Sequence, residues 1–334
     1  MKKIFLFLLL IPFLLTANDM DKDKTINNAA LYKEAVKTTK KLKKTSALSL
    51  NNKRINLMKE LQNYTDCLSY VTFEDYLVSS EQQSLEMERT IPILYYYRNA
   101  FDTILDELRT TKASKNSVSV WFLYNMGVIV RTPSGCYGID INHRWAEKLE
   151  PYLDFICVTH DHGDHRSEAL MQAMRKANKP VLSNFFKEDK MHCSTVPTNY
   201  TIGNFSIKTD ITDHNKVLLN FVSVFRIEGD GFSILHCGDS NFVPTQYVNT
   251  VGDVNLLVFF STESVIGNQI IGADLVMPDY AALAHFTELR HRIDTSPRRY
   301  PLIKMLNGAS SINCEHTILP LWGEKLIWKD GKFQ

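Results

Sequence analysis

The run from His160 to His165 constrains this chain more than any other stretch. It reads His-Asp-His-Gly-Asp-His and places three imidazoles and two carboxylates within six residues. Imidazole and carboxylate ligands together suit zinc or a similar divalent ion. Residues 154–159 are apolar and β-branched, as in a buried strand, so the histidines are expected on the loop at its carboxyl end. The run therefore predicts a metal site, with a solvated polar loop as the alternative.

This cluster resembles the signature of the metallo-β-lactamase-fold hydrolases. The resemblance implies an α/β fold, a four-layer αββα metallo-β-lactamase-like sandwich, with two metal ions in one cleft. It also implies further ligands downstream: a lone histidine, then an aspartate that follows glycine after a strand, then a last histidine at a strand end. The chain offers His214, Asp239 and His285 in that order.

Two of these positions have competing explanations. His214 stands alone in a polar loop, which is a common surface feature, and its order along the chain is what supports it as a ligand. Asp239 follows an alternating run at 232–236 that predicts a strand. His236 and Cys237 are alternative ligands there, but we interpret both as buried strand residues, in which a reduced thiol behaves as a small apolar group.

The surroundings of His285 depart from the pattern of many relatives. Those relatives carry Pro and Gly before the final ligand, whereas this chain has Leu283 and Ala284. The run from 285 to 291 nevertheless resembles a His-x-x-Glu-Leu-x-His pattern near the end of some relatives, in which the first His is the ligand. We expect Glu288 or His291 to support that ligand from outside, with an ordinary helix start as the alternative.

The resemblance distributes seven ligands over two ions: His160, His162 and His214 for the first, Asp164, His165 and His285 for the second, and Asp239 as the bridge. It implies attack by a metal-bridging hydroxide on an ester, lactone, amide or phosphodiester. Asp164 is the expected catalytic residue, because it would orient that nucleophile. The expected ions are two Zn²⁺, with Mn²⁺ or Fe as alternatives.

Two other functions remain as alternatives: a non-catalytic metal-binding or scaffold protein that retains the fold, and a nucleic-acid-processing hydrolase of the same superfamily. Removing Lys2 and Lys3 with a signal peptide would lower the 38 basic residues to 36, against 37 acidic ones. That balance gives no positive field and argues against nucleic acid. The sequence contexts look closer to the lactonase and phospholipase-like branches, so we expect a small-molecule or lipid-like substrate.

The N-terminus differs in kind from the rest of the chain. Two lysines and the apolar run Ile4 to Leu15 predict a signal peptide over 1–17, with an uncleaved membrane anchor as the alternative. The protein is therefore expected to be exported, periplasmic or secreted, with membrane contact through its N-terminus. Residues 18–54 are rich in Lys and Asn and predict a solvated or loosely helical linker.

A helical extension is predicted over 55–116, ahead of a hydrolase domain over 117–334. Apolar residues recur at helical spacing between Ile91 and Leu108, which predicts a long amphipathic helix packed against that domain. Within the domain we expect an opening hairpin about the turn 132–135, then two helices and several strands. The helices are expected at 145–149 and 168–178, and the strands at 118–130, 138–140, 181–184, 205–208, 221–227 and 232–236.

Overall fold

The structure is a computed structural model that describes residues 17–260, 266–290 and 302–334. The predicted signal peptide thus falls almost entirely outside the described residues. Among the helices of these ranges, none combines the length and the apolar character needed to cross a membrane.

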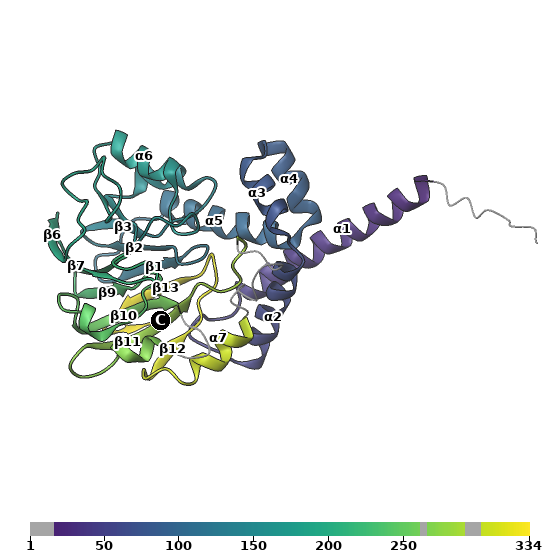
Figure 1. The fold of residues 1–334 in the computed structure, drawn as a ribbon. Coiled ribbons are helices and arrows are strands. Elements are labelled where there is room, and N and C mark those ends of the chain that lie inside the picture. The colour runs from purple at the N-terminus through teal and green to yellow at the C-terminus, as the bar shows by residue number, and fades with distance from the viewer. Residues whose placement is uncertain (1–16, 261–265, 291–301) are drawn as a thin grey trace, which may run out of the picture.

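Two seven-stranded sheets form the body of the protein (Figure 1). The first has the order β14-β13-β1-β2-β3-β4-β5, with bounds Lys332–Phe333, Lys325–Lys329, Val118–Phe122, Val128–Thr132, Gly135–Ile139, Phe155–Cys157 and Val181–Leu182. The second has the order β12-β11-β10-β9-β8-β7-β6, with bounds His316–Ile318, Val276–Ala284, Gly252–Phe260, Phe232–His236, Val222–Gly229, Phe205–Thr212 and Thr198–Ile202. Helices flank both sheets, so the predicted α/β sandwich is confirmed.

Each sheet contains a parallel set of strands. Strands β3, β4 and β5 are parallel neighbours in the first sheet, and β9 to β12 are parallel neighbours in the second. The carboxyl ends of parallel neighbours meet at one edge of a sheet, which is where loops most often carry ligands. Three of the four loops that carry the predicted metal residues leave β4, β9 and β11 at these edges, and the fourth, which carries His214, leaves β7.

The helices fall into an N-terminal group and a set beside the sheets. The N-terminal group is α1 (Ala17–Leu42), α2 (Asn52–Asp66), α3 (Tyr70–Val78), α4 (Glu81–Thr90) and α5 (Pro92–Thr110). The others are α6 (Glu168–Lys176), α7 (Leu302–Ala309) and the 3₁₀ helices η1 (Ala146–Tyr152), η2 (Pro244–Gln246) and η3 (Ile266–Ile270).

Helix α5 is the predicted amphipathic helix. Its inner face buries Leu94, Tyr97, Phe101, Ile104 and Leu108, which recur three and four residues apart. The helix also joins the first sheet through polar contacts, since the Trp121 indole donates to a carboxylate of α5 at 2.9 Å. The prediction that this helix packs against the domain that follows it is confirmed.

The segment predicted as a linker contains helix α1, whose second half packs against α4 and α5. Ala35, Thr38, Thr39 and Leu42 are buried on one face of that half. The many lysines of this segment led us to expect that it would be surrounded by solvent. In the second half of α1, however, the lysines lie on the exposed face of the helix. The residues that pack are the few small and apolar ones between the lysines.

The opening hairpin differs from the prediction in one respect. The turn over 132–135 joins β2 and β3 as expected. The single strand expected over 118–130 is instead two strands, β1 and β2, joined by a tight turn in which Leu123 N donates to Gly127 O at 2.7 Å. Asn125 adopts a left-handed backbone there, with φ 59°, which asparagine tolerates better than most residues.

Candidate metal centre

The seven predicted ligands lie on four loops at the carboxyl ends of strands. Five residues come from two loops: the loop after β4 supplies His160, His162, Asp164 and His165, and the loop after β7 supplies His214. Asp239 follows β9, and His285 directly follows β11. Both sheets therefore contribute side chains, and the cluster lies where their edges meet.

Three histidines form the first group. The His160 Nε2 and the His162 Nδ1 lie 3.0 Å apart. The His214 ring lies 5.3 Å from the His160 ring and 4.8 Å from the His162 ring, measured between centroids. One nitrogen of each ring lies within 4.8 Å of the others, as three ligands of one ion would.

Asp164, His165 and His285 form the second group, and all three are buried. The Asp164 Oδ2 lies 3.2 Å from the His285 Nε2 and 3.7 Å from the His165 Nε2. His285 has φ 64°, a backbone conformation that non-glycine residues rarely adopt and that is concentrated at functional sites. The strand end is thereby bent so that the imidazole faces the carboxylate.

Asp239 faces both groups at once. Its Oδ2 lies 3.5 Å from the His214 Nε2 and 3.5 Å from the His285 Nε2, and its Oδ1 lies 3.3 Å from the His165 Nε2. A carboxylate with one group on each side has the position that a bridging ligand needs. The structure thus brings all seven predicted residues into one cluster, with Asp239 in its middle.

The buried polar atoms of this cluster fit a cation. The His165 Nε2 and the Asp239 Oδ1 are both buried and neither has a properly oriented hydrogen bond within the described residues. Burial disfavours the charged form of His165, but Asp239 and Asp164 outweigh burial and raise its pKa. The two buried carboxylates therefore favour a positive charge on His165, a charge that divalent ions would supply when bound.

Asp140 supports the cluster from behind, and sequence reasoning did not find this role. Its Oδ2 accepts from the Thr159 hydroxyl at 2.7 Å and lies 2.9 Å from the His165 Nδ1. Its Oδ1 accepts from the Thr159 backbone N at 2.7 Å. A carboxylate on the far nitrogen of a histidine fixes the tautomer and the orientation of that ring. In the sequence, the one indication of this role was an acidic residue directly after strand β3. Strand β3 lies beside β4, which leads into the loop that carries His160 to His165, called the metal loop below.

Asn125 holds Asp164 in a similar way. Its amide nitrogen donates to the Asp164 Oδ2 at 3.2 Å and to the Asp164 backbone O at 3.1 Å. The His285 backbone N donates to the Asn125 backbone O at 3.3 Å. The tight turn between β1 and β2 therefore fixes two residues of the second group.

The remaining predictions near His285 have different outcomes. Glu288 lies in an irregular loop rather than at a helix start, and its carboxylate accepts from the Tyr124 hydroxyl at 2.8 Å. His291 lies outside the described residues. Glu288 thus supports the segment after His285 by fixing it to the first sheet.

The two alternative ligands lie outside the cluster. The His236 Nε2 lies 2.9 Å from the Met126 backbone O, and the ring is fully buried in the strand. Burial raises the pKa of the Cys237 thiol to about 12, so this thiol stays protonated. Neither residue belongs to the groups that could hold a metal ion.

An apolar rim borders the first group. Phe221 lies beside the three histidines, with ring centroids 5.0 Å from His162 and 6.2 Å from His214. On the same loop Val217 and Leu219 are 86% and 60% exposed. The loop is internally fixed, since its polar side chains bond its own backbone nitrogens. It therefore presents apolar side chains to solvent next to the candidate metal centre.

Comparison with known proteins agrees with this geometry. Residues 131–267 match the family model described as the beta-lactamase superfamily domain. This match covers less than half of the chain and agrees with the resemblance that the sequence analysis found. A search of curated protein sequences finds no match to this chain.

Solved structures also resemble this chain at low identity. The metallo-beta-lactamase fold protein YhfI from Bacillus subtilis is 15% identical over 64% of this chain and 100% of its own, with a TM-score of 0.44. Igni18, a metallo hydrolase from Ignicoccus hospitalis, is 12% identical over 64% and 99%, with a TM-score of 0.42. CmlA, a diiron β-hydroxylase from Streptomyces venezuelae, is 11% identical over 65% and 55%, with a TM-score of 0.45.

Proposed function

We propose that this protein is a dinuclear metal-dependent hydrolase. The supporting observation is the position of Asp239, whose two carboxylate oxygens face the histidines of both groups. Three side chains per group and a shared carboxylate would leave each ion an open position, which is typical of catalytic sites. Bound divalent ions would supply Lewis acidity and an activated water.

The chain's own residues define what else the site does. Asp164 is the proposed catalytic residue, since Asn125 orients its carboxylate toward the second group. Asp140 fixes the orientation of His165. The buried surroundings of these groups strengthen their electrostatic interactions.

The substrate that we propose is an ester, lactone, amide or phosphodiester of a small or lipid-like molecule. The exposed apolar side chains of Val217 and Leu219, beside Phe221, support a substrate with an apolar portion. When a ligand covers such side chains, the burial of their apolar surface contributes favourably to the free energy of binding.

The test combines metal content with a substrate screen. The protein is loaded with zinc, manganese or iron and assayed against lactones, aryl esters, phosphodiesters and β-lactams. We expect about two ions per chain, turnover of at least one substrate class, and loss of both in Asp239→Ala. Cys237→Ser is the matched control, because this side chain lies next to the cluster and outside it. Metal binding without turnover of any substrate would favour the scaffold alternative, and a stoichiometry of one ion would contradict the bridge.

A further inference from the structure

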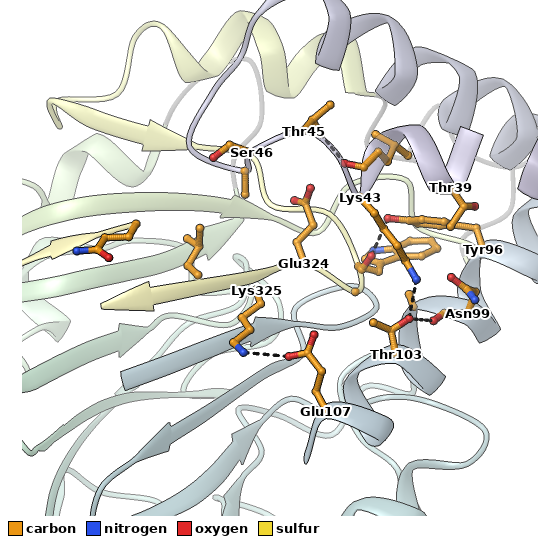
Figure 2. Close-up of a pocket in the computed structure, with 17 residues that line it drawn as sticks. Thr39, Lys43, Thr45, Ser46, Tyr96, Asn99, Thr103, Glu107, Glu324 and Lys325 are labelled. Atoms are coloured by element: carbon orange, nitrogen blue, oxygen red, sulfur yellow. Dashed lines mark hydrogen bonds and ion pairs between the residues drawn. The ribbon is translucent and has the colours of Figure 1, made fainter. Parts of the chain in front are cut away.

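A pocket of about 310 Å³ lies between the N-terminal helices and the C-terminal strands (Figure 2). Its walls come from the end of α1, from α5 and from the segment that leads into β13. It shares no lining residue with the candidate metal centre. The volume is at the lower end of the range for small-molecule sites.

The walls of this pocket are fixed by buried contacts. Arg54 is fully buried and forms two bonds to the Glu324 carboxylate, at 2.5 and 2.7 Å. The Tyr96 hydroxyl donates to the Trp322 backbone O at 2.6 Å. Gly323 has φ 84°, and a Cβ there would lie 2.9 Å from the α5 backbone. The pocket is therefore formed in advance of any ligand.

The charges that line the pocket are not all neutralised. Glu107 accepts from Lys325 at 3.1 Å, and Glu324 is occupied by Arg54. Lys43 donates to the neutral Thr103 hydroxyl at 2.9 Å and has no carboxylate within ion-pair distance in the described part of the chain. Burial lowers the pKa of Lys43, and nearby Glu107 opposes that shift. The Lys43 ammonium at the pocket thus forms no direct ion pair with the described residues.

Asn99 supplies a second unmatched group. Its side chain lies on the pocket wall beside Thr103 (Figure 2). The Asn99 Oδ1 is buried and accepts no hydrogen bond from the described residues. Leaving a buried acceptor unpaired is unfavourable, so most such atoms have a partner. An external donor at this position would satisfy the Asn99 Oδ1.

We propose that this pocket binds a small organic carboxylate that also carries an O–H or N–H donor. The carboxylate would pair with Lys43, and the donor would reach the Asn99 Oδ1. The apolar part would lie against Leu42 and Tyr96, which line the same space. A single unpaired ammonium suits a monoanion better than a multiply charged phosphate.

The experiment uses 4-hydroxyphenylacetate as the probe in isothermal titration calorimetry with the full chain. Two analogues separate the contributions: 4-methylphenylacetate lacks the donor, and 2-(4-hydroxyphenyl)ethanol lacks the charge. Titrations are run with chelated protein and with Asp239→Ala, because a carboxylate could also bind ions at the metal centre. We expect binding in both, with each analogue weaker by about tenfold.

Three variants test the assigned contacts. Lys43→Met should weaken binding of the probe by about tenfold, whereas the control Lys44→Met, at the neighbouring exposed lysine, should leave it unchanged. Asn99→Leu should abolish the preference for the hydroxyl over the methyl analogue. Thermal melts establish that each variant is folded. Two results would overturn the proposal. One is no detectable binding of the probe to the wild-type protein at a probe concentration tenfold above a dissociation constant of about 1 mM. The other is equal binding by Lys43→Met and Lys44→Met.

Discussion

The Arg290 Nε donates to the Glu74 Oε1 at 3.0 Å and joins two residues that lie 216 positions apart. The same guanidinium donates from Nη1 to the backbone O of Gly163, inside the run that contains four of the candidate ligands. Helix α3 of the N-terminal extension is thereby connected to the metal loop. The extension is thus part of the support for the site.

Replacing Arg290 by methionine should therefore loosen the metal loop. The variant keeps the apolar stem and loses the donors to Glu74 and Gly163. Residues that hold metal ligands in place without contacting the ion typically change the metal affinity by about 10-fold or more. We therefore expect the metal affinity of this variant to fall by about tenfold. Competition with a chromophoric chelator measures it. Asp106→Asn, which breaks an exposed pair with Arg109, is the control and should change nothing.

Asp140→Asn should weaken metal binding more than the Arg290 variant. The substitution keeps the size of the side chain but removes the charge that faces the His165 Nδ1. We expect affinity to fall by about 10- to 100-fold, measured by the same competition. Asp230→Asn is a matched change at a surface turn, where the carboxylate binds Ser134. If the two variants bound metal equally well, Asp140 would have no role in orienting His165.

His143 should make the fold sensitive to acid. Its ring is stacked between Tyr97 and Phe101, with centroids 4.1 and 3.9 Å away. Burial lowers the pKa of His143 well below its usual value. The unfolded chain therefore takes up a proton near pH 6.5 that the folded protein does not, so the contribution to stability is present above about pH 6.5 and is lost as the pH falls.

The measurement compares wild-type protein with His143→Phe in urea unfolding from pH 7.5 to 5. The free energy of unfolding of the wild type should fall relative to the variant by about 1.4 kcal/mol per pH unit below pH 6.5. The histidines of the metal centre contribute to both proteins and cancel in the difference. Parallel pH profiles would contradict the assignment to His143.

Breaking the buried ion pair between Arg54 and Glu324 should destabilise the protein strongly. Arg54→Met leaves a carboxylate that is 15% exposed without its partner, and the expected loss is about 3 to 5 kcal/mol in the free energy of unfolding. The double variant Arg54→Met/Glu324→Leu should recover most of that loss, because no unpaired charge remains. A double variant as unstable as the single one would show that the charge is not the cause.

The sequence was sufficient for the parts of the site that local patterns define. The strand before His160, the alternating strand before Asp239 and the helix that follows Ser167 all lie where their periodicity predicted. That helix ends at Lys176, before the predicted end, since Asn178 adopts a left-handed backbone with φ 55°. Local propensity and hydrophobic period depend only on neighbouring residues, so one sequence reveals them.

Other features depend on residues far apart in the chain. Asp140 was recognised only as a strand end, because its contact with His165 requires β3 and β4 to be neighbours. The contacts of Arg54 with Glu324 and of Glu74 with Arg290 span 270 and 216 positions. No local pattern encodes such pairs. The packing of the N-terminal helices on the body was therefore predicted only for α5, whose apolar face is visible in the sequence.

The division of the ligands between the two sheets has a thermodynamic consequence. His160 and His165 follow a strand of the first sheet, whereas Asp239 and His285 follow strands of the second. Ions held by ligands from both sheets would bind the folded chain and not the unfolded one. The free energy of unfolding would then rise by about 1.4 kcal/mol for each tenfold increase in free metal above the dissociation constant of a site. The concentration of free metal around the protein would thus set the fraction of chains that are folded at equilibrium.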